Sequence, residues 1–180
     1  DLPSQHAPVN EPVAGNYFVA VYPPFSAWNA PQVTALREAL ERPAPGKPLG
    51  IYVHLPFCQK KCDYCYYLSY IAQPAAVVKR YLEAVVRECA LYAELPGVKG
   101  RSLAFAYFGG GTPSILSSTQ IRSLVNGLQQ ELSWDGIKEV TFECAPRSVR
   151  REFLATLQEV GVTRLSLGVQ SFDDELLRRN

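Results

Sequence analysis

Four short apolar segments recur after residue 48, and a helical pattern or the start of one follows each of them. The predicted strands cover residues 51–55, 102–108, 139–146 and 164–172. Apolar strands that alternate with helices are typical of a parallel sheet whose faces are covered. The alternation therefore predicts an α/β fold in which helices pack on a parallel sheet.

The predicted helices carry apolar residues at helical spacing and have recognisable end signals. Pro74 is suited to open the first helix, and Ser117 with Gln120 resembles a capping box for the second. Gly161 closes the third helix, and a fourth begins near Asp173. The first three helices thus separate successive strands.

Polar residues and glycines lie at the carboxyl ends of the predicted strands. A cysteine-rich loop follows the first strand and glycines at 109–111 follow the second, while Glu143 and Gln170 lie near the ends of the third and fourth. Barrel enzymes build their active sites at this edge, whereas an open doubly wound sheet, which also fits, binds ligands only near a switch point. We therefore predict the first four βα units of a partial (β/α) TIM-type barrel over residues 49–180.

Residues 1–48 are rich in proline, which favours an extended N-terminal arm with one short helix near residues 32–41. The chain begins with Asp1 and contains no methionine, and four strands cannot close a barrel. We therefore expect the native chain to continue with further βα units. On this expectation, residues 1–180 alone would leave the outer strands unpaired and would aggregate.

The composition argues against several classes of partner. The formal net charge is +1 and no polybasic run occurs, so we expect neither nucleic-acid binding nor attachment to a membrane. There is no long apolar run and no signal peptide, which favours a cytoplasmic protein. Unpaired, clustered cysteines are typical of a reducing compartment.

Three of the five cysteines, Cys58, Cys62 and Cys65, lie within eight residues of one another. Buried cysteines that pack as small hydrophobes have no reason to cluster, and an odd total fits a disulfide framework poorly. Three close thiolates therefore indicate a metal centre. Zinc would need a fourth ligand, for which His54 is near in the sequence. A [4Fe–4S] cluster on three cysteines would leave one iron open for chemistry, and the spacing alone leaves both alternatives open.

Four ordered blocks of the sequence resemble one known family. "YVHLPFCQKKCDYC" carries the cysteines, "YFGGGTPS" ends the second strand, and "TFECAP" and "RLSLGVQSFDDELL" cover the third and fourth. Together they resemble the HemN-like branch of the radical S-adenosylmethionine (SAM) superfamily, which is named for oxygen-independent coproporphyrinogen III oxidase. The resemblance runs from about Gly50 to the end of the chain and implies a radical SAM barrel.

The resemblance implies that Cys58, Cys62 and Cys65 bind three irons of a [4Fe–4S] cluster and that a first SAM chelates the fourth. Reduction by an electron donor such as flavodoxin or ferredoxin would cleave this SAM to a 5′-deoxyadenosyl radical. The glycines lack side chains, so a ligand can approach their carbonyls. The residues that the resemblance places at the first SAM are Tyr52, Gly109, Gly110, Gly111 and Glu143. Those that it places at a second SAM are Tyr64, Gly111, Thr112 and Gln170.

Two positions depart from the family pattern. Tyr67 stands where the porphyrinogen-decarboxylating members carry a further cysteine, and Ala145 stands where the family has an acidic residue. The family arginine for the second SAM would fall beyond Asn180. The absent cysteine disfavours coproporphyrinogen as the substrate.

The function that follows is the transfer of a one-carbon unit to a small-molecule substrate, by methylation or cyclopropanation, with a second SAM. A tetrapyrrole enzyme of the coproporphyrinogen III oxidase or haem-opening type stays open. A non-enzymatic haem chaperone on the same fold also stays open, although the arm disfavours it. His54 is expected to be a hydrogen-bonded structural residue, and Cys89 and Cys144 are expected to be core thiols.

Overall fold

The computed structural model describes residues 30–65 and 67–179. The chain divides into two compact units, and the second, which begins at Leu40, contains the sheet. Helix α1 (Ala30–Leu40) confirms the short helix that we expected near residues 32–41. The predicted arm before residue 30 lies outside the described residues, and its division from the barrel at residue 48 stays a prediction.

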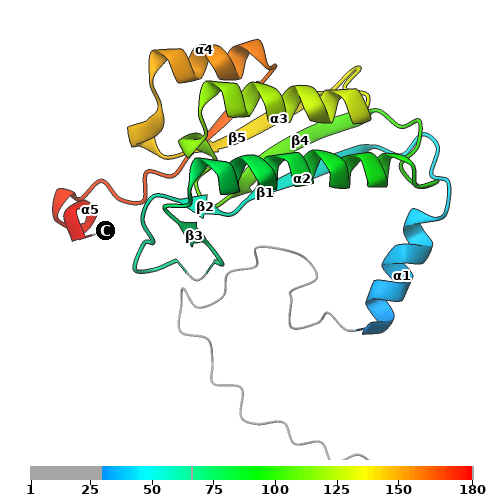
Figure 1. Ribbon diagram of the computed structural model, residues 1–180, viewed down its shortest axis with the longest axis horizontal. Coiled ribbons are helices and arrows are strands. Elements are labelled where there is room, and N and C mark those ends of the chain that lie inside the picture. The colour runs from blue at the N-terminus through cyan, green and yellow to red at the C-terminus, as the bar shows by residue number, and fades with distance from the viewer. Residues whose placement is uncertain (1–29, 66, 180) are drawn as a thin grey trace, which may run out of the picture. The chain divides into compact units, whose positions relative to one another are not determined.

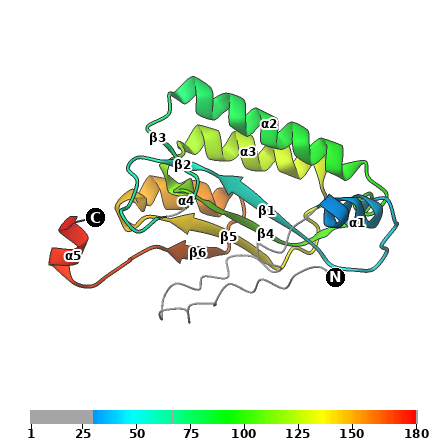
Figure 2. The same cartoon turned by 90° about the horizontal axis from the view of Figure 1, so that it is seen from below.

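The main sheet consists of four parallel strands that neighbour one another in chain order (Figures 1 and 2). They are β1 (Leu49–Leu55), β4 (Leu103–Gly110), β5 (Glu139–Cys144) and β6 (Arg164–Leu167). Each strand extends the sheet in the same direction, as in a barrel. The order of the described strands does not reverse, as it would at the switch point of a doubly wound sheet. The predicted α/β class is confirmed, and the strand order favours the barrel.

Three helices cover one face of this sheet, as Figures 1 and 2 show. They are α2 (Ala75–Ala93), α3 (Ser118–Glu131) and α4 (Arg151–Glu159). The expected capping box of α3 is present, because the Ser117 hydroxyl accepts from the Gln120 N–H and the Gln120 side chain accepts from the Ser117 N–H. The Asp173 carboxylate accepts from two N–H groups in α5 (Asp174–Arg179). None of the described helices has the length and apolar character that crossing a membrane requires.

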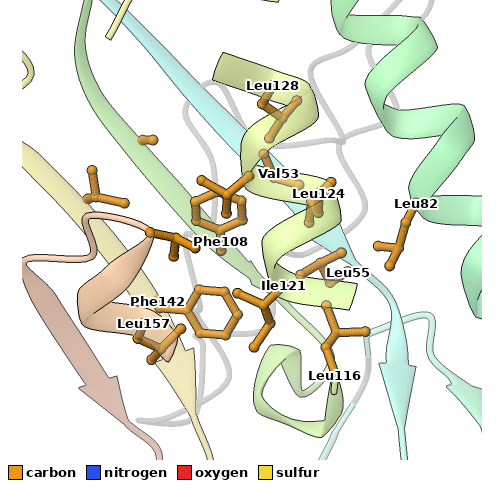
Figure 3. Close-up of a cluster of buried hydrophobic side chains, with 14 of the residues drawn as sticks. Val53, Leu55, Leu82, Phe108, Leu116, Ile121, Leu124, Leu128, Phe142 and Leu157 are labelled. Atoms are coloured by element: carbon orange, nitrogen blue, oxygen red, sulfur yellow. The ribbon is translucent and has the colours of Figure 1, made fainter. Parts of the chain in front are cut away.

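The hydrophobic core lies between the sheet and the helices. Phe108 of β4 and Phe142 of β5 stack with their ring centroids 5.4 Å apart. Helix α3 contributes Ile121, Leu124 and Leu128 to the same cluster (Figure 3). These five side chains are each at most 1% exposed, so their removal from water stabilises the layered arrangement.

The other face of the sheet carries aromatic and polar side chains. Because side chains alternate along a strand, Tyr52 and His54 lie on this face, whereas Val53 and Leu55 are buried on the helix side. Tyr52 is opposite Tyr107 in the register of β1 and β4, and their ring centroids are 5.9 Å apart. Tyr52 is nevertheless 58% exposed. In a barrel this face is the interior.

Two strands are shorter than the sequence predicts. The third was expected to reach residue 146, but β5 ends at Cys144, because Pro146 lacks an N–H group for the ladder and begins the 3₁₀ helix η3 (Pro146–Ser148). The fourth was expected to reach residue 172, but β6 ends at Leu167. Beyond it the chain turns, and Gln170 has a φ of +68°, outside the range of a strand. Both predicted ends are wrong, and Gln170 lies past the strand.

Candidate functional site

The cysteine-rich loop begins and ends in a small sheet that the sequence did not predict. Strand β2 (Phe57–Cys58) pairs in parallel with β3 (Tyr70–Ile71). Within the loop, the N–H of Cys65 donates to the carbonyl of Cys62 at 3.0 Å. Two-residue strands are too short to show a periodic pattern, so tertiary pairing rather than sequence reveals them. Both ends of the loop are therefore held next to Cys58.

The three clustered cysteines are free thiols, with Cys58 buried and Cys62 and Cys65 partly exposed. Within residues 30–65 and 67–179, no three His, Cys, Asp or Glu side chains meet as ligands of a single metal ion. His54, the expected fourth ligand of a zinc ion, instead shares a 3.0 Å hydrogen bond between its Nδ1 atom and the Tyr52 hydroxyl. His54 is therefore hydrogen-bonded, as expected.

An iron–sulfur cluster requires a different arrangement of the thiols from that around a single metal ion. Each cysteine binds a separate iron of a [4Fe–4S] cluster, so the sulfurs surround the cluster and do not meet at one ion. The Cys58 sulfur accepts a hydrogen bond from the Thr112 hydroxyl at 3.5 Å. Burial and a hydrogen bond with Cys62 raise the pKa of Tyr64 to about 12. The free thiols fit a cluster as its ligands, and the hydroxyl groups beside them fit as groups that surround those ligands.

Gly109 and Gly111 allow two other parts of the predicted site to approach the end of β4. A Cβ atom at Gly109 would lie 3.0 Å from the carboxylate of Glu143. A Cβ atom at Gly111 would lie 2.9 Å from the sulfur of Cys58. Side chains of the chain itself therefore approach these two glycines closely, and the approach of a ligand stays a prediction. These two glycines bring Glu143 and Cys58 to opposite ends of one short stretch of backbone.

The carboxylate of Glu143 is held at both oxygens. The Tyr107 hydroxyl donates to Oε1 at 2.7 Å, and the N–H of Gly110 donates to Oε2 at 3.2 Å. Burial, followed by the hydrogen bond to Glu143, raises the pKa of Tyr107. Burial and the charge of Glu143 raise the pKa of Tyr52 to about 12. The same carboxylate, that of Glu143, therefore acts on both tyrosine hydroxyls.

Tyr107 contacts Glu143, although the sequence did not predict it at the site. The residue lies in an apolar strand and there belongs to the strand pattern. Its position opposite Tyr52 and its bond to Glu143 become visible only when β1, β4 and β5 are in register. No local signal marks this contact, because a partly exposed hydroxyl can also be satisfied by water.

A pair of serines joins the glycine segment to the end of β5. The Ser114 hydroxyl accepts from the N–H of Ala145 at 2.9 Å, and the Ser148 hydroxyl donates to the Ala145 carbonyl at 2.7 Å. Ala145 is the position where the family has an acidic residue, and its backbone is satisfied here by these two hydroxyls. The Ser114 and Ser148 hydroxyls also share a hydrogen bond, in which Ser114 donates because Ser148 gives its proton to the carbonyl. The two segments that carry the glycines and Glu143 are thus held together.

Contacts to the cysteine group are present for three of the four residues expected at a second SAM. Gly111 and Thr112 contact Cys58, and Tyr64 contacts Cys62 within the cysteine loop. Gln170 lies beyond β6, where its side-chain amide nitrogen is 2.7 Å from the position that a Cβ atom at Gly168 would take. Its association with the other three residues therefore stays a prediction.

Replacing Gly110 by alanine is expected to lower the free energy of unfolding by about 3 kcal/mol, because backbone strain adds to a steric clash. Gly110 has a φ of +117°, and the new Cβ atom would lie 2.8 Å from the His54 ring. Urea unfolding measures this change. The control is Gly136→Ala, where φ is +75° and no atom lies within 4 Å, so that only about 1–2 kcal/mol is expected. An equal loss of unfolding free energy in the two variants would contradict the expected clash with the His54 ring.

Comparison with known proteins identifies the family. Residues 52–180 match the model of the radical SAM superfamily. The haem chaperone HemW of Escherichia coli (strain K12) is 33% identical over 132 residues, which cover 73% of this chain and 34% of that protein. Oxygen-independent coproporphyrinogen III oxidase of the same organism is 34% identical over 134 residues, which cover 74% of this chain and 29% of the oxidase.

A bovine mitochondrial relative, radical S-adenosyl methionine domain-containing protein 1, is 37% identical over 77% of this chain and 31% of its own length. The solved structure of the coproporphyrinogen III oxidase HemN from E. coli, described as a radical SAM enzyme, matches with a TM-score of 0.73 and 33% identity. That match covers 82% of this chain and 34% of the HemN chain. The chain thus spans about a third of the length of the relatives that it matches.

The structural match agrees with the parallel sheet, the strand order and the edge at which the glycines and Glu143 lie. It confirms the expected partial TIM-type barrel, and the superfamily implies a [4Fe–4S] cluster and SAM as cofactors. The chain belongs to the radical SAM superfamily, in its HemN-like branch.

Proposed function

We propose that this chain forms the cluster- and SAM-binding part of a radical SAM enzyme. The observation that carries this proposal is the position of Gly109 and Gly111, which bring the Glu143 carboxylate and the Cys58 sulfur against the same end of β4. Cys58, Cys62 and Cys65 would hold the cluster. When bound there, the cluster would supply the electron for the cleavage of SAM to a 5′-deoxyadenosyl radical.

The residues around the cluster have distinct tasks in this proposal. Glu143 carries a negative charge that attracts the ammonium group of SAM, and charge-assisted hydrogen bonds of this kind are strong. Tyr107 and Gly110 fix the direction of that carboxylate before SAM arrives. Tyr52 borders the same charge on the barrel-interior face. The electron comes from a protein donor such as flavodoxin or ferredoxin.

We further propose that the reaction is the transfer of a one-carbon unit to a small molecule, with a second SAM as the carbon donor. Two features support this choice. Tyr67 takes the place of the additional cysteine of the decarboxylating members. Tyr64 and Thr112, which match second-SAM positions, lie beside Cys62 and Cys58.

Haem chemistry is the second candidate, and the names of the relatives favour it. The proteins matched over the same residues include a haem chaperone and a coproporphyrinogen III oxidase. On this alternative, the substrate or cargo is a tetrapyrrole.

The nucleoside products separate these functions. The natural protein, loaded with its cluster, is incubated without oxygen with SAM, dithionite and either coproporphyrinogen III, haem or a small-molecule extract of the source cells. One-carbon transfer with two SAM molecules forms both 5′-deoxyadenosine and S-adenosylhomocysteine. Gln170→Ala is expected to reduce S-adenosylhomocysteine roughly two- to tenfold, the usual effect of one lost hydrogen bond, without a similar loss of 5′-deoxyadenosine. Chromatography quantifies both nucleosides.

The matched control is Gln129→Ala, which removes the same side chain from the exposed surface of α3. Decarboxylation of coproporphyrinogen III without S-adenosylhomocysteine would replace one-carbon transfer by the oxidase activity. Stable haem binding without formation of either nucleoside would favour the chaperone.

A further inference from the structure

Thr112 lies at a position where its side chain would ordinarily cap a helix. It is the N-cap residue of the 3₁₀ helix η2 (Pro113–Ile115), but its side chain makes no capping hydrogen bond. Threonine is favoured at N-caps because its oxygen accepts from a free N–H group of the first turn. The Thr112 hydroxyl instead points its hydrogen at the Cys58 sulfur, with an O–S distance of 3.5 Å. The side chain therefore bonds to the sulfur and does not cap the helix.

Backbone hydrogen bonds fix this geometry. The N–H of Thr112 donates to the Phe57 carbonyl at 2.8 Å, and the N–H of Gly111 donates to the Leu55 carbonyl at 2.8 Å. These bonds join the end of β4 to the segment that leads into Cys58. Gly111 has no side chain to separate the two, since its Cβ atom would lie 2.9 Å from the Cys58 sulfur. The hydroxyl and the sulfur are thus held together by the fold.

Cys58 is also the member of the cysteine group that water reaches least. It is 9% exposed, whereas Cys62 and Cys65 are partly exposed in the loop. A hydrogen bond is electrostatically stronger in a less polar environment, because water does not compete for the acceptor. Among the three sulfurs, a hydroxyl donor therefore has the largest effect at Cys58.

We propose that Thr112 is a positioning residue that raises the reduction potential of the cluster through its hydrogen bond to the Cys58 sulfur. This inference rests on the proposed function, in which Cys58 binds an iron. One electron from the donor adds one negative charge to the cluster and its sulfur ligands. A donor hydrogen bond stabilises the more negative state more strongly, so it makes reduction easier. This role differs from the contact with a second SAM that the resemblance implies for Thr112.

The test is the midpoint potential of the cluster in the natural protein, measured without SAM. Dithionite with redox mediators supplies the electrons, and the electron paramagnetic resonance signal reports the reduced cluster. Thr112→Val and Thr112→Ala remove the hydroxyl, and each is expected to lower the equilibrium constant for reduction about tenfold, which is a fall of about 59 mV for one electron. Thr112→Ser keeps the hydroxyl and is expected to keep the wild-type potential. Thr119→Val, on the exposed surface of α3, is the matched control and is expected to change nothing.

An unchanged potential in Thr112→Val and Thr112→Ala would overturn the inference, and so would an equal fall in Thr112→Ser. Loss of the cluster in both hydroxyl-free variants would also overturn it, because the hydroxyl would then be needed for binding and not for tuning. A contact with a second SAM predicts no change in a measurement made without SAM. Failure of the wild-type protein to bind iron would instead reject the proposed function itself.

Discussion

Single replacement of Cys58, Cys62 or Cys65 by alanine is expected to abolish the iron–sulfur signal of the anaerobically reconstituted protein. Each variant leaves two of the three protein thiolates, which hold a [4Fe–4S] cluster poorly. Cys58 is expected to be as necessary as the other two, although it is buried in β2 and they are partly exposed in the loop. Iron and sulfide content per chain, together with the visible absorption of the cluster, measures the loss.

Cys89→Ala and Cys144→Ala are the matched controls and are expected to retain the cluster. Both side chains are buried in the core, as the sequence predicted. Burial, with the nearby charge of Glu143, raises the pKa of Cys144 to about 11. A thiol with such a pKa stays protonated at neutral pH and is a poor metal ligand. A protein that holds one zinc ion and no iron after reconstitution would contradict the cluster assignment.

Replacing Phe142 by alanine is expected to lower the free energy of unfolding by about 3–5 kcal/mol, the usual cost of a deleted core aromatic ring. The Phe142 ring lies between two others, stacked on Phe108 with centroids 5.4 Å apart and edge-on to Phe153 at 6.1 Å. Relaxation of β5 at this point also moves Glu143, the next residue in the strand. SAM affinity is therefore expected to fall together with stability. Urea unfolding and equilibrium binding of SAM measure the two effects.

Leu91→Ala is the control for this prediction. Leu91 lies on α2 and is 73% exposed, so its removal is expected to change stability by no more than about 0.5 kcal/mol. If Phe142→Ala unfolds as wild type does, the aromatic stack does not support the site. If stability falls but SAM affinity does not, Glu143 is held independently of the core.

Local patterns in the sequence were sufficient for the main elements of the fold. Helix α3 was predictable because Ser117 and Gln120 satisfy each other's N–H groups within four residues. The strands were predictable because their side chains alternate or are continuously apolar. The residue at which a strand ends is harder to predict, because it depends on whether a neighbouring strand offers hydrogen-bond partners for the backbone. This is why the predicted ends of β5 and β6 were wrong.

The sequence by itself determined the class of fold, the edge of the sheet that carries the site, and the cysteine group, because each depends on the type and spacing of nearby residues. Only the tertiary structure decided which side chains meet at that edge. Thr112 bonds to Cys58, 54 residues away, and Tyr107 bonds to Glu143, 36 residues away. Such contacts are set by the register of parallel strands and by how each loop returns to the sheet. A shift of one residue would turn every side chain of a strand to the other face, so no local pattern specifies these pairs.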